Sequence, residues 1–335
     1  MEDNILEVKN LTKYFPVQGG SLKVQNRYVK AVDDVSFAIK RGETLSMVGE
    51  SGCGKSTTGR CVIDLIKPTS GIVNFNGKNL ISVSEKERRE LTGKMQMIFQ
   101  DPYMSLNPRM TIGEIVEEPL IVHGIGKNRT ERMEMAMDML EKVGMRPDQY
   151  YRYPHGFSGG QKQRIGIARA LILKPELVVC DEPVSALDVS IQSQVLNLLG
   201  QMKKDLGITY LFISHNMSVV RYVSDRIAVM YLGHIVELAE TEELFNNPIH
   251  PYTKALLSAV PEVDIHTKKE PIVLEGEIPS PLKPPQGCVF HNRCKYCKPI
   301  CTDQFPSFKE RIPGHFVSCF RSKEFLLESK MGRKI

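Results

Sequence analysis

Alternating apolar and polar positions near the start of the chain predict strands with one buried face. Ile5 to Val8 and Val32 to Ile39 follow this two-residue period. Ile72 to Phe75 runs directly into Asn76-Gly77, a dipeptide favoured in two-residue hairpin turns. Together these segments predict an antiparallel β layer.

Short, mostly apolar runs predict strands of a second kind, buried on both faces as in a parallel sheet. Thr44 to Val48, Leu177 to Cys180 and Tyr210 to Ser214 are runs of this kind. Between the first two, from about Thr111 to Arg152, the period becomes helical. The apolar positions are Ile112, Ile115, Val116, Leu120, Met135, Met139, Leu140 and Val143. The pattern predicts an α/β fold with a mainly parallel sheet, a β layer and a helical segment between two of the buried strands.

The residues after the first buried run form a phosphate-binding loop. Gly49-Glu50-Ser51-Gly52-Cys53-Gly54-Lys55-Ser56 fits the pattern G-x-x-x-x-G-K-S, and a helix is predicted from Ser56 to about Ile66. Glycines let backbone N–H groups turn inward around phosphate oxygens. Lys55 can reach the β- and γ-phosphates, the Ser56 hydroxyl can bind Mg²⁺, and Thr57 is counted with the nucleotide-binding residues.

The second buried run ends in two carboxylates, Asp181 and Glu182. Acidic groups at the carboxyl end of a central parallel strand suit nucleotide chemistry. Asp181 suits the Mg²⁺ shell, and Glu182 suits a general base that orients water toward the γ-phosphate. An isolated segment of this kind would be an acidic turn after a core strand. The phosphate loop upstream makes ATP or GTP hydrolysis the better interpretation.

A third segment, Phe157-Ser158-Gly159-Gly160-Gln161-Lys162-Gln163-Arg164, predicts a second anion site. Ser158 is a favourable N-cap, and Gly159 and Gly160 leave backbone N–H groups uncovered. The helix predicted from Gln161 to Leu171 then directs its positive end outward.

This third segment resembles the signature sequence of ABC-type ATPases, and the three motifs stand in that family's order. The resemblance implies that Ser158, Gly159, Gly160 and Gln161 grip the γ-phosphate held by the phosphate loop of a partner subunit. Two composite sites would therefore form when two such domains meet. The helices around residues 101–165 correspond to the family's inserted helical subdomain.

The resemblance assigns roles to four further residues. Phe15 matches the aromatic that stacks on adenine, although its neighbour Tyr14 and a core role for either ring remain alternatives. Gln100 matches the glutamine that touches Mg²⁺ and the attacking water. Asp188, in Ser185-Ala186-Leu187-Asp188, matches the loop that crosses the dimer interface. His215 matches the histidine that contacts the γ-phosphate.

Composition and charge agree with a cytoplasmic enzyme. The 335 residues can bury a large core, and 44 basic against 39 acidic residues give a net charge of +5, which is no nucleic-acid signature. The start, Met1-Glu2-Asp3-Asn4, has no apolar export core, so we expect no secretory signal. Apolar runs fall short of the ~20 residues of a membrane span. If the protein serves a transporter, other chains supply the channel.

The tail resembles one branch of the family. His250-Pro251-Tyr252-Thr253, followed by a predicted helix from Lys254 to Val260, looks like the mark of ATPase subunits from dipeptide and oligopeptide importers. A proline-rich connector follows. We therefore expect an ATPase domain at 1–250 and an extension at 251–335.

Five of the 8 cysteines lie in the last 50 residues: Cys288, Cys294, Cys297, Cys301 and Cys319. Without an export signal a metal site is favoured over disulfides. Cys288, Cys294, Cys301 and Cys319, with Arg293 before the second of them, resemble the 4Fe–4S motif of this subfamily. Zinc or no metal are the alternatives, and Cys297 could compete for ligation. The other three, Cys53, Cys61 and Cys180, are interpreted as packing residues.

The metal site is predicted to be structural and distant from ATP chemistry, since every nucleotide motif precedes residue 216. A segment with many prolines and few apolar residues can hardly build a core of its own, and metal ligation could supply the missing folding energy.

The resemblance covers about residues 5 to 322 and implies the ATP-hydrolysing subunit of a peptide importer at the cytoplasmic face of a prokaryotic plasma membrane. The stretch from Gln100 to Met110 resembles the second of two paired ATPase subunits. The implied partners are a second ATPase subunit, identical or paralogous, two transmembrane permease subunits and an extracellular or periplasmic solute-binding protein. ATP would close the two nucleotide-binding domains, and hydrolysis would reopen them.

Two alternative functions remain. The same kind of importer could carry nickel or an oligosaccharide, because cargo is chosen by other chains. A soluble ABC ATPase acting on nucleic acid or ribosomes usually has two cores or long insertions, whereas this chain has one core and one short helical insertion.

Overall fold

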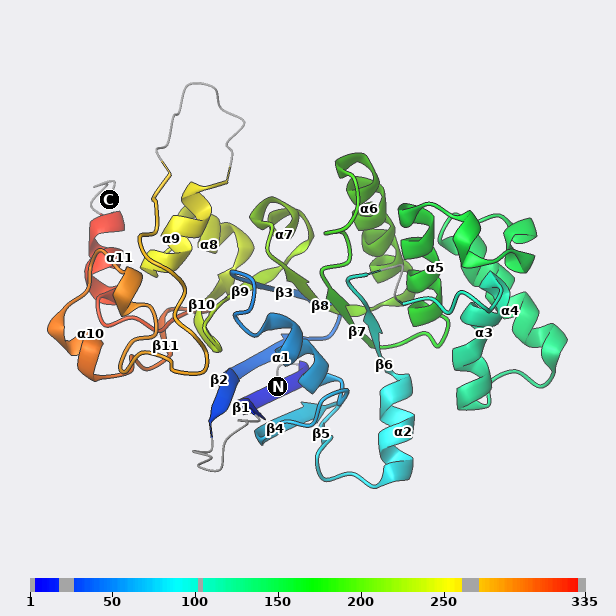
Figure 1. Ribbon diagram of the computed structural model, residues 1–335, viewed down its shortest axis with the longest axis horizontal. Coiled ribbons are helices and arrows are strands. Elements are labelled where there is room, and N and C mark those ends of the chain that lie inside the picture. The colour runs from blue at the N-terminus through cyan, green and yellow to red at the C-terminus, as the bar shows by residue number, and fades with distance from the viewer. Residues whose placement is uncertain (1–3, 18–26, 102–104, 261–270, 331–335) are drawn as a thin grey trace. The chain divides into compact units, whose positions relative to one another are not determined.

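The computed structural model describes residues 4–17, 27–101, 105–260 and 271–330 (Figure 1). The chain divides into two compact units. Unit 1 comprises Met1–Leu6, Ile39–Glu43 and Phe75–Ile213, and unit 2 comprises Glu7–Ala38, Thr44–Asn74 and Ser214–Ile335. Pro102, within the stretch that resembles the second paired ATPase subunit, lies outside the described residues.

Unit 1 contains three parallel strands in the order β8–β7–β6. Every residue of β7 and β8 is buried, as the apolar runs predict. The strands are β6 (Met95–Ile98), β7 (Leu177–Asp181) and β8 (Thr209–Ser214). Short β5 (Lys78–Asn79) and helices α2 (Glu85–Gly93) and α6 (Val189–Leu206) belong to the same unit.

The helical insertion of unit 1 forms because each helix has its own start and stop signals. Thr111 makes a capping box with Glu114 at the start of α3, and Gly124 ends that helix in a left-handed conformation. The helices are α3 (Ile112–His123), α4 (Arg129–Lys142) and α5 (Gly159–Leu171), which pack on one another, with 3₁₀ turns η1 (Pro147–Tyr151) and η2 (Pro154–Gly156). Met139, one of the apolar positions of the predicted helical period, is buried in this packing.

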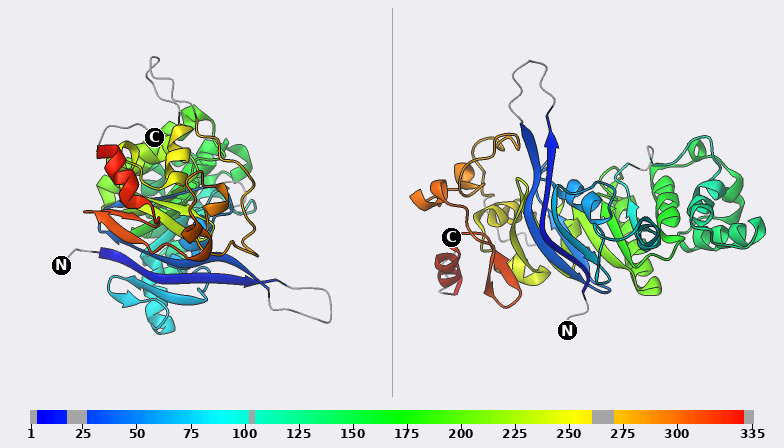
Figure 2. Two further views of the ribbon diagram at one scale, coloured as in Figure 1. Left: turned by 90° about the vertical axis from the view of Figure 1, so that its left-hand side faces the viewer. Right: turned by 90° about the horizontal axis from the view of Figure 1, so that it is seen from below.

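Unit 2 carries the β layer, in the order β2–β1–β4. Val17 N donates to Arg27 O at 2.9 Å, and Figure 2 shows the first two strands side by side, running in opposite directions. The strands are β1 (Asn4–Pro16), β2 (Tyr28–Lys40) and β4 (Ser70–Phe75). After β4, Asn76 and Gly77 have φ of 49° and 75°, the positive values of the predicted two-residue turn.

A second set of strands in unit 2 follows the order β11–β12–β10–β9–β3. β3 and β9 are parallel, and the remaining pairs are antiparallel. The strands are β3 (Thr44–Val48), β9 (Arg226–Tyr231), β10 (His234–Glu240), β11 (Lys309–Ile312) and β12 (His315–Val317). The tail therefore adds β11 and β12 to strands from the middle of the chain, which the sequence pattern did not predict.

Helices complete unit 2. They are α1 (Lys55–Val62), α7 (Met217–Val223), α8 (Thr241–Asn246), α9 (Pro251–Ser258), η3 (His291–Arg293), α10 (Pro299–Asp303) and α11 (Ser322–Lys330). Two differ from the predicted bounds. α1 ends at Val62 because Asp64, with φ of 60°, turns the chain away before Ile66. α9 begins at Pro251, where proline suits a first turn.

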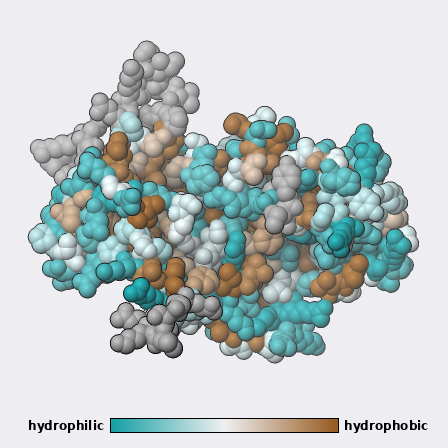
Figure 3. Space-filling view, in the orientation of Figure 1, coloured by the Kyte–Doolittle hydropathy of each residue, from teal (hydrophilic) through white to brown (hydrophobic). Residues whose placement is uncertain are grey.

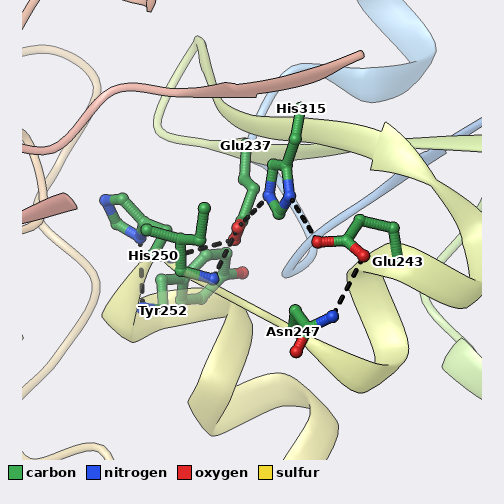
Figure 4. A network of polar contacts seen from close by, with 7 residues as sticks. Glu237, Glu243, Asn247, His250, Tyr252 and His315 are labelled. Atoms are coloured by element: carbon green, nitrogen blue, oxygen red, sulfur yellow. Dashed lines mark hydrogen bonds and ion pairs between the residues drawn. The ribbon is translucent and has the colours of Figure 1, made fainter. Parts of the chain in front are cut away.

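A buried carboxylate ties the tail to β10 (Figure 4). Glu237 accepts hydrogen bonds from the backbone N–H of Ile249 at 2.7 Å and of His250 at 3.1 Å, and its other contact is His315 Nε2 at 2.8 Å. His250 Nδ1 accepts from Tyr252 N at 3.1 Å and so caps α9. One strand residue thus fixes both the start of α9 and strand β12.

Candidate functional site

The phosphate loop between β3 and α1 can be built only with glycine at two positions. Gly49 and Gly54 have φ of 152° and 107°. A Cβ on Gly49 would lie 2.1 Å from the carbonyl oxygen of Met230, and one on Gly54 would lie 2.1 Å from that of Ala31. Side chains are therefore excluded on steric grounds, and the backbone can close around an anion.

Lys55 begins α1 directly after this loop and turns back over it. Its ammonium group donates to the carbonyl oxygens of Gly49 at 2.8 Å and Glu50 at 3.0 Å, and the residue is only 5% exposed. Gly54, the N-cap, offers no side-chain acceptor to the first-turn N–H groups, which suits phosphate. Ser56 and Thr57 stand partly exposed in that turn.

The remaining loop residues divide by exposure. Ser51 and Gly52 are exposed, and Gly52 has φ of 77°. Cys53 is buried, and burial raises the pKa of its thiol, consistent with the predicted packing role.

Glu50 links the loop to the tail. Its backbone N–H donates to the hydroxyl of Tyr252 at 2.9 Å, and its carboxylate accepts from both terminal nitrogens of Arg293 at 2.7 and 3.1 Å. The prediction that the Cys-rich segment is distant from ATP chemistry is therefore wrong. Distance along the sequence misled it, because 243 positions separate Glu50 from Arg293.

Unit 1 brings together the predicted base and the predicted glutamine. Gln100 Nε2, after β6, donates to Glu182 Oε2 at 2.9 Å. The N–H of Glu182 donates to Ile213 O at 3.0 Å, and its φ of 47° turns the chain away from the strand direction directly after β7. Asp181, the last residue of β7, is 1% exposed. The parallel pairing of β7 with β6 thus brings an amide and a carboxylate together at one edge of the sheet.

The signature segment starts α5 with a capping box, as predicted for Ser158. Ser158 Oγ accepts from Gln161 N at 3.4 Å, and Gln161 Oε1 accepts from Ser158 N at 3.0 Å. The helix begins at Gly159, two residues before the predicted start, because the cap lies at Ser158. A Cβ on Gly160 would lie 2.5 Å from Cγ2 of Ile191, so close packing on α6 favours glycine. Asp188 is the exposed N-cap of α6.

Two predicted nucleotide contacts belong to unit 2. Phe15 is half-buried in β1, and the ammonium of Lys13 lies 4.9 Å from its ring centroid. The neighbouring Tyr14 hydroxyl donates to Asp33 at 2.7 Å; burial and Asp33 raise its pKa, so this ring is held by its own neighbours. His215 is exposed directly after β8.

The four predicted cysteine ligands line one pocket in the tail. Cys288, Cys294, Cys301 and Cys319 share it with aromatic and basic side chains, whereas Cys297 is exposed. Burial raises the pKa of Cys288 to about 12 and that of Cys319 to about 11, so both thiols are protonated at neutral pH without a cation. Within residues 4–17, 27–101, 105–260 and 271–330, no three His, Cys, Asp or Glu side chains are placed to hold one metal ion. Cysteine sulfur is the donor type that a thiolate-ligated cluster uses.

The sequence reasoning missed Tyr252 and Arg293 as loop contacts. The only signal was their place inside tail motifs of the predicted family.

None of the helices in the described segments is both long and apolar enough to cross a membrane.

Comparisons with protein families match two parts of the chain. Residues 32–185 match the family described as ABC transporter, and residues 236–301 match the oligopeptide/dipeptide transporter C-terminal region. The chain is 54% identical over 321 residues to the oligopeptide transport ATP-binding protein AppF of Bacillus subtilis (strain 168), covering 95% of this chain and 97% of that protein. It is 50% identical to the oligopeptide transport ATP-binding protein OppF of Salmonella typhimurium, covering 95% and 96%.

Solved structures of ATP-binding cassettes have the same fold. The dimeric cassette MJ0796 in a post-hydrolysis state with ADP and Pi matches with a TM-score of 0.62 and 29% identity, covering 70% of this chain and 98% of that one. CbiO1 of Clostridium perfringens matches with a TM-score of 0.62 and 28% identity, covering 73% and 91%. The predicted P-loop α/β fold with inserted helices is confirmed.

Proposed function

This chain belongs to the ABC transporter family, as an ATP-binding subunit of the oligopeptide and dipeptide importers, and from that premise we propose how its residues work. It is an ATPase whose hydrolysis of ATP powers peptide import. The observation that carries the proposed chemistry is the 2.9 Å contact between Gln100 and Glu182 beyond β7.

Each motif has one task in the proposed mechanism. Lys55 and the loop from Gly49 to Ser56 would hold the phosphates, and Ser56, Gln100 and Asp181 would hold Mg²⁺, which would neutralise phosphate charge. Glu182 accepts the proton of the attacking water, which Gln100 orients. His215 contacts the γ-phosphate.

The remaining roles concern adenine and the partner. Phe15 stacks on adenine. Ser158, Gly159, Gly160 and Gln161 act on the nucleotide of the partner subunit, and Asp188 crosses the dimer interface. ATP closes the pair of domains, and hydrolysis followed by phosphate release reopens it.

Two substitutions separate binding from chemistry. Lys55→Ala should weaken ATP binding because it removes charge from the phosphates. Glu182→Gln keeps the shape but removes the base, so it should retain ATP in a closed dimer and lower hydrolysis by roughly 10²–10⁴-fold. ATP binding and phosphate release are measured side by side, with the exposed carboxylate Glu240, changed to Gln, as control. Near-normal turnover in Glu182→Gln would overturn the assignment.

The proposed partners are a second ATPase subunit, two permease subunits and a solute-binding protein, with this chain as the second of the paired ATPases at the cytoplasmic face. Apolar surface over the end of α3 supports a permease contact (Figure 3). Ile121, Val122 and Ile125 are 59%, 52% and 38% exposed there. We take residues 1–250 as the ATPase domain and 251–335 as its extension.

The cysteine pocket is proposed to hold a 4Fe–4S cluster through Cys288, Cys294, Cys301 and Cys319, with zinc as the alternative. The support is the common pocket and the exposure of Cys297 outside it. Bound metal would convert the four thiols to thiolates and contribute folding free energy to a segment with few apolar residues.

A further inference from the structure

Glu50 is the only acidic residue among the eight of the phosphate loop, and three of its groups are engaged. Its N–H donates to Tyr252, its carbonyl accepts from Lys55 at 3.0 Å, and its carboxylate accepts from Arg293. The loop residue beside the phosphate cradle is thus held from outside by two residues of the tail.

The contact with Arg293 is a partly buried, two-point ion pair. The Arg293 side chain is 7% exposed and that of Glu50 is 26% exposed. A guanidinium that meets a carboxylate through two parallel hydrogen bonds fixes direction as well as charge. The Arg293 guanidinium also lies 6.0 Å from the ring centroid of Tyr231, which limits its freedom further.

The elements that carry the two tail residues are themselves fixed. Tyr252 lies in the first turn of α9, whose start is held by Glu237 and capped by His250. Arg293 closes η3, directly before Cys294. The rings of Tyr231 and Tyr252 pack on Phe290 at 5.2 and 5.4 Å between centroids. Packing and hydrogen bonds therefore fix both residues that contact Glu50.

We propose that Tyr252 and Arg293 form a tail clamp, a pair of positioning residues that holds Glu50 and thereby keeps the phosphate loop open to nucleotide and its acidic side chain away from the phosphates. The proposal rests on the proposed phosphate-binding role of the loop. Arg293 neutralises a negative charge that would otherwise repel the nucleotide, and Tyr252 fixes the Glu50 peptide.

The test is equilibrium binding of Mg-ATP to the full chain. Arg293→Gln leaves an unpaired carboxylate in the loop, so we expect ATP to bind about tenfold more weakly. In the double variant Glu50→Gln/Arg293→Gln that charge is gone, and binding should return to within about threefold of the wild type. Tyr252→Phe keeps the ring in the core and removes only the hydroxyl, and should weaken binding by about threefold.

Lys298→Gln is the matched control, because it removes a tail cation whose ion-pair partner, Glu324 at 2.7 Å, belongs to the tail as well. It should leave ATP binding unchanged. Thermal unfolding of every variant identifies those that fail to fold, and Tyr252→Phe is the variant expected to keep its stability.

Two results would overturn the tail clamp. One is a double variant that binds ATP as weakly as Arg293→Gln or more weakly. That result would mean that Arg293 acts through the structure and not through the charge of Glu50. The other is normal ATP binding by Arg293→Gln while Lys55→Ala still weakens it, which refutes the clamp and leaves the phosphate site intact. Normal binding by Lys55→Ala would instead refute the phosphate site itself.

Discussion

At the scale of the residue, the buried pair His315 and Glu237 shows how charge is accommodated in the tail. Both side chains are 0% exposed. Burial alone would lower the pKa of His315, but the carboxylates of Glu237 and Glu243 at its two ring nitrogens raise it above the ordinary value of 6.5. A protonated imidazole can donate to both carboxylates at once.

This arrangement predicts a pH-dependent cost for His315→Gln. Because the folded pKa is raised, the stabilisation by His315 is complete below pH 6.5 and is lost as pH rises through the folded value. We expect a loss of about 3 kcal/mol in the free energy of unfolding at pH 6 and a smaller loss at pH 9. Urea unfolding at the two pH values measures it.

His155→Gln, at an exposed position, is the control for the histidine substitution. It should change stability little at either pH. An equal cost for His315→Gln at pH 6 and pH 9 would mean that the imidazole is not charged in the folded protein.

At the scale of the element, the sequence pattern predicted the strands that are defined by their own residues, and not the pairing between distant segments. β3 and β7 lie where their apolar runs indicate, because a strand buried on both faces leaves a continuous signal. The end of α1 was predicted too late, since the positive φ of Asp64 leaves no mark in the apolar period. The pairing of β12 with β10 was not predictable, because it joins short segments far apart in the chain.

The candidate site divides in the same way. Short sequence motifs predicted three parts of the site. These are the phosphate loop, the capping box of Ser158 and the sheet edge with Gln100 and Glu182. The contact of Arg293 with Glu50 could not be predicted from neighbouring residues. An arginine beside a cysteine is equally compatible with an exposed side chain, a place near metal ligands or an ion pair.

The cysteine pocket gives the prediction at this scale. Anaerobically purified protein should be brown and contain about four irons per chain. Cys294→Ser removes a pocket ligand and should bleach the colour, whereas Cys297→Ser changes an exposed thiol and should not. Visible absorption and iron analysis measure both. Colourless protein with one zinc would refute the cluster, and bleaching by Cys297→Ser would refute the choice of ligands.

At the scale of the whole molecule, the proposed composite sites require two chains. Each site combines the phosphate loop and Glu182 of one subunit with the signature of the other, so a defect in either can be complemented only across the pair. If the natural partner is a paralogue, this chain alone should be mostly monomeric and should hydrolyse ATP slowly.

Mixing variants tests this in the assembled pair. Lys55→Ala damages the phosphate-loop half of the site and Ser158→Arg damages the signature half. Each mixed pair therefore keeps one intact site, and the mixture should recover part of the ATPase activity. Lys55→Ala with Glu182→Gln is the matched control, because both defects lie in the same half and no intact site can form. Absence of recovery in the first mixture, measured as phosphate release by variants that form pairs with each other, would contradict the composite site.

The packing of the tail also sets how short a working fragment of this protein can be. Val289 and Phe290 share one hydrophobic cluster with Val48, the last residue before the phosphate loop. A polypeptide truncated before α9 would expose the aromatic faces of this cluster to water, and each buried aromatic ring covers roughly 150–250 Å². An excised nucleotide-binding fragment should therefore be soluble and fold only when its C-terminus extends past Arg293.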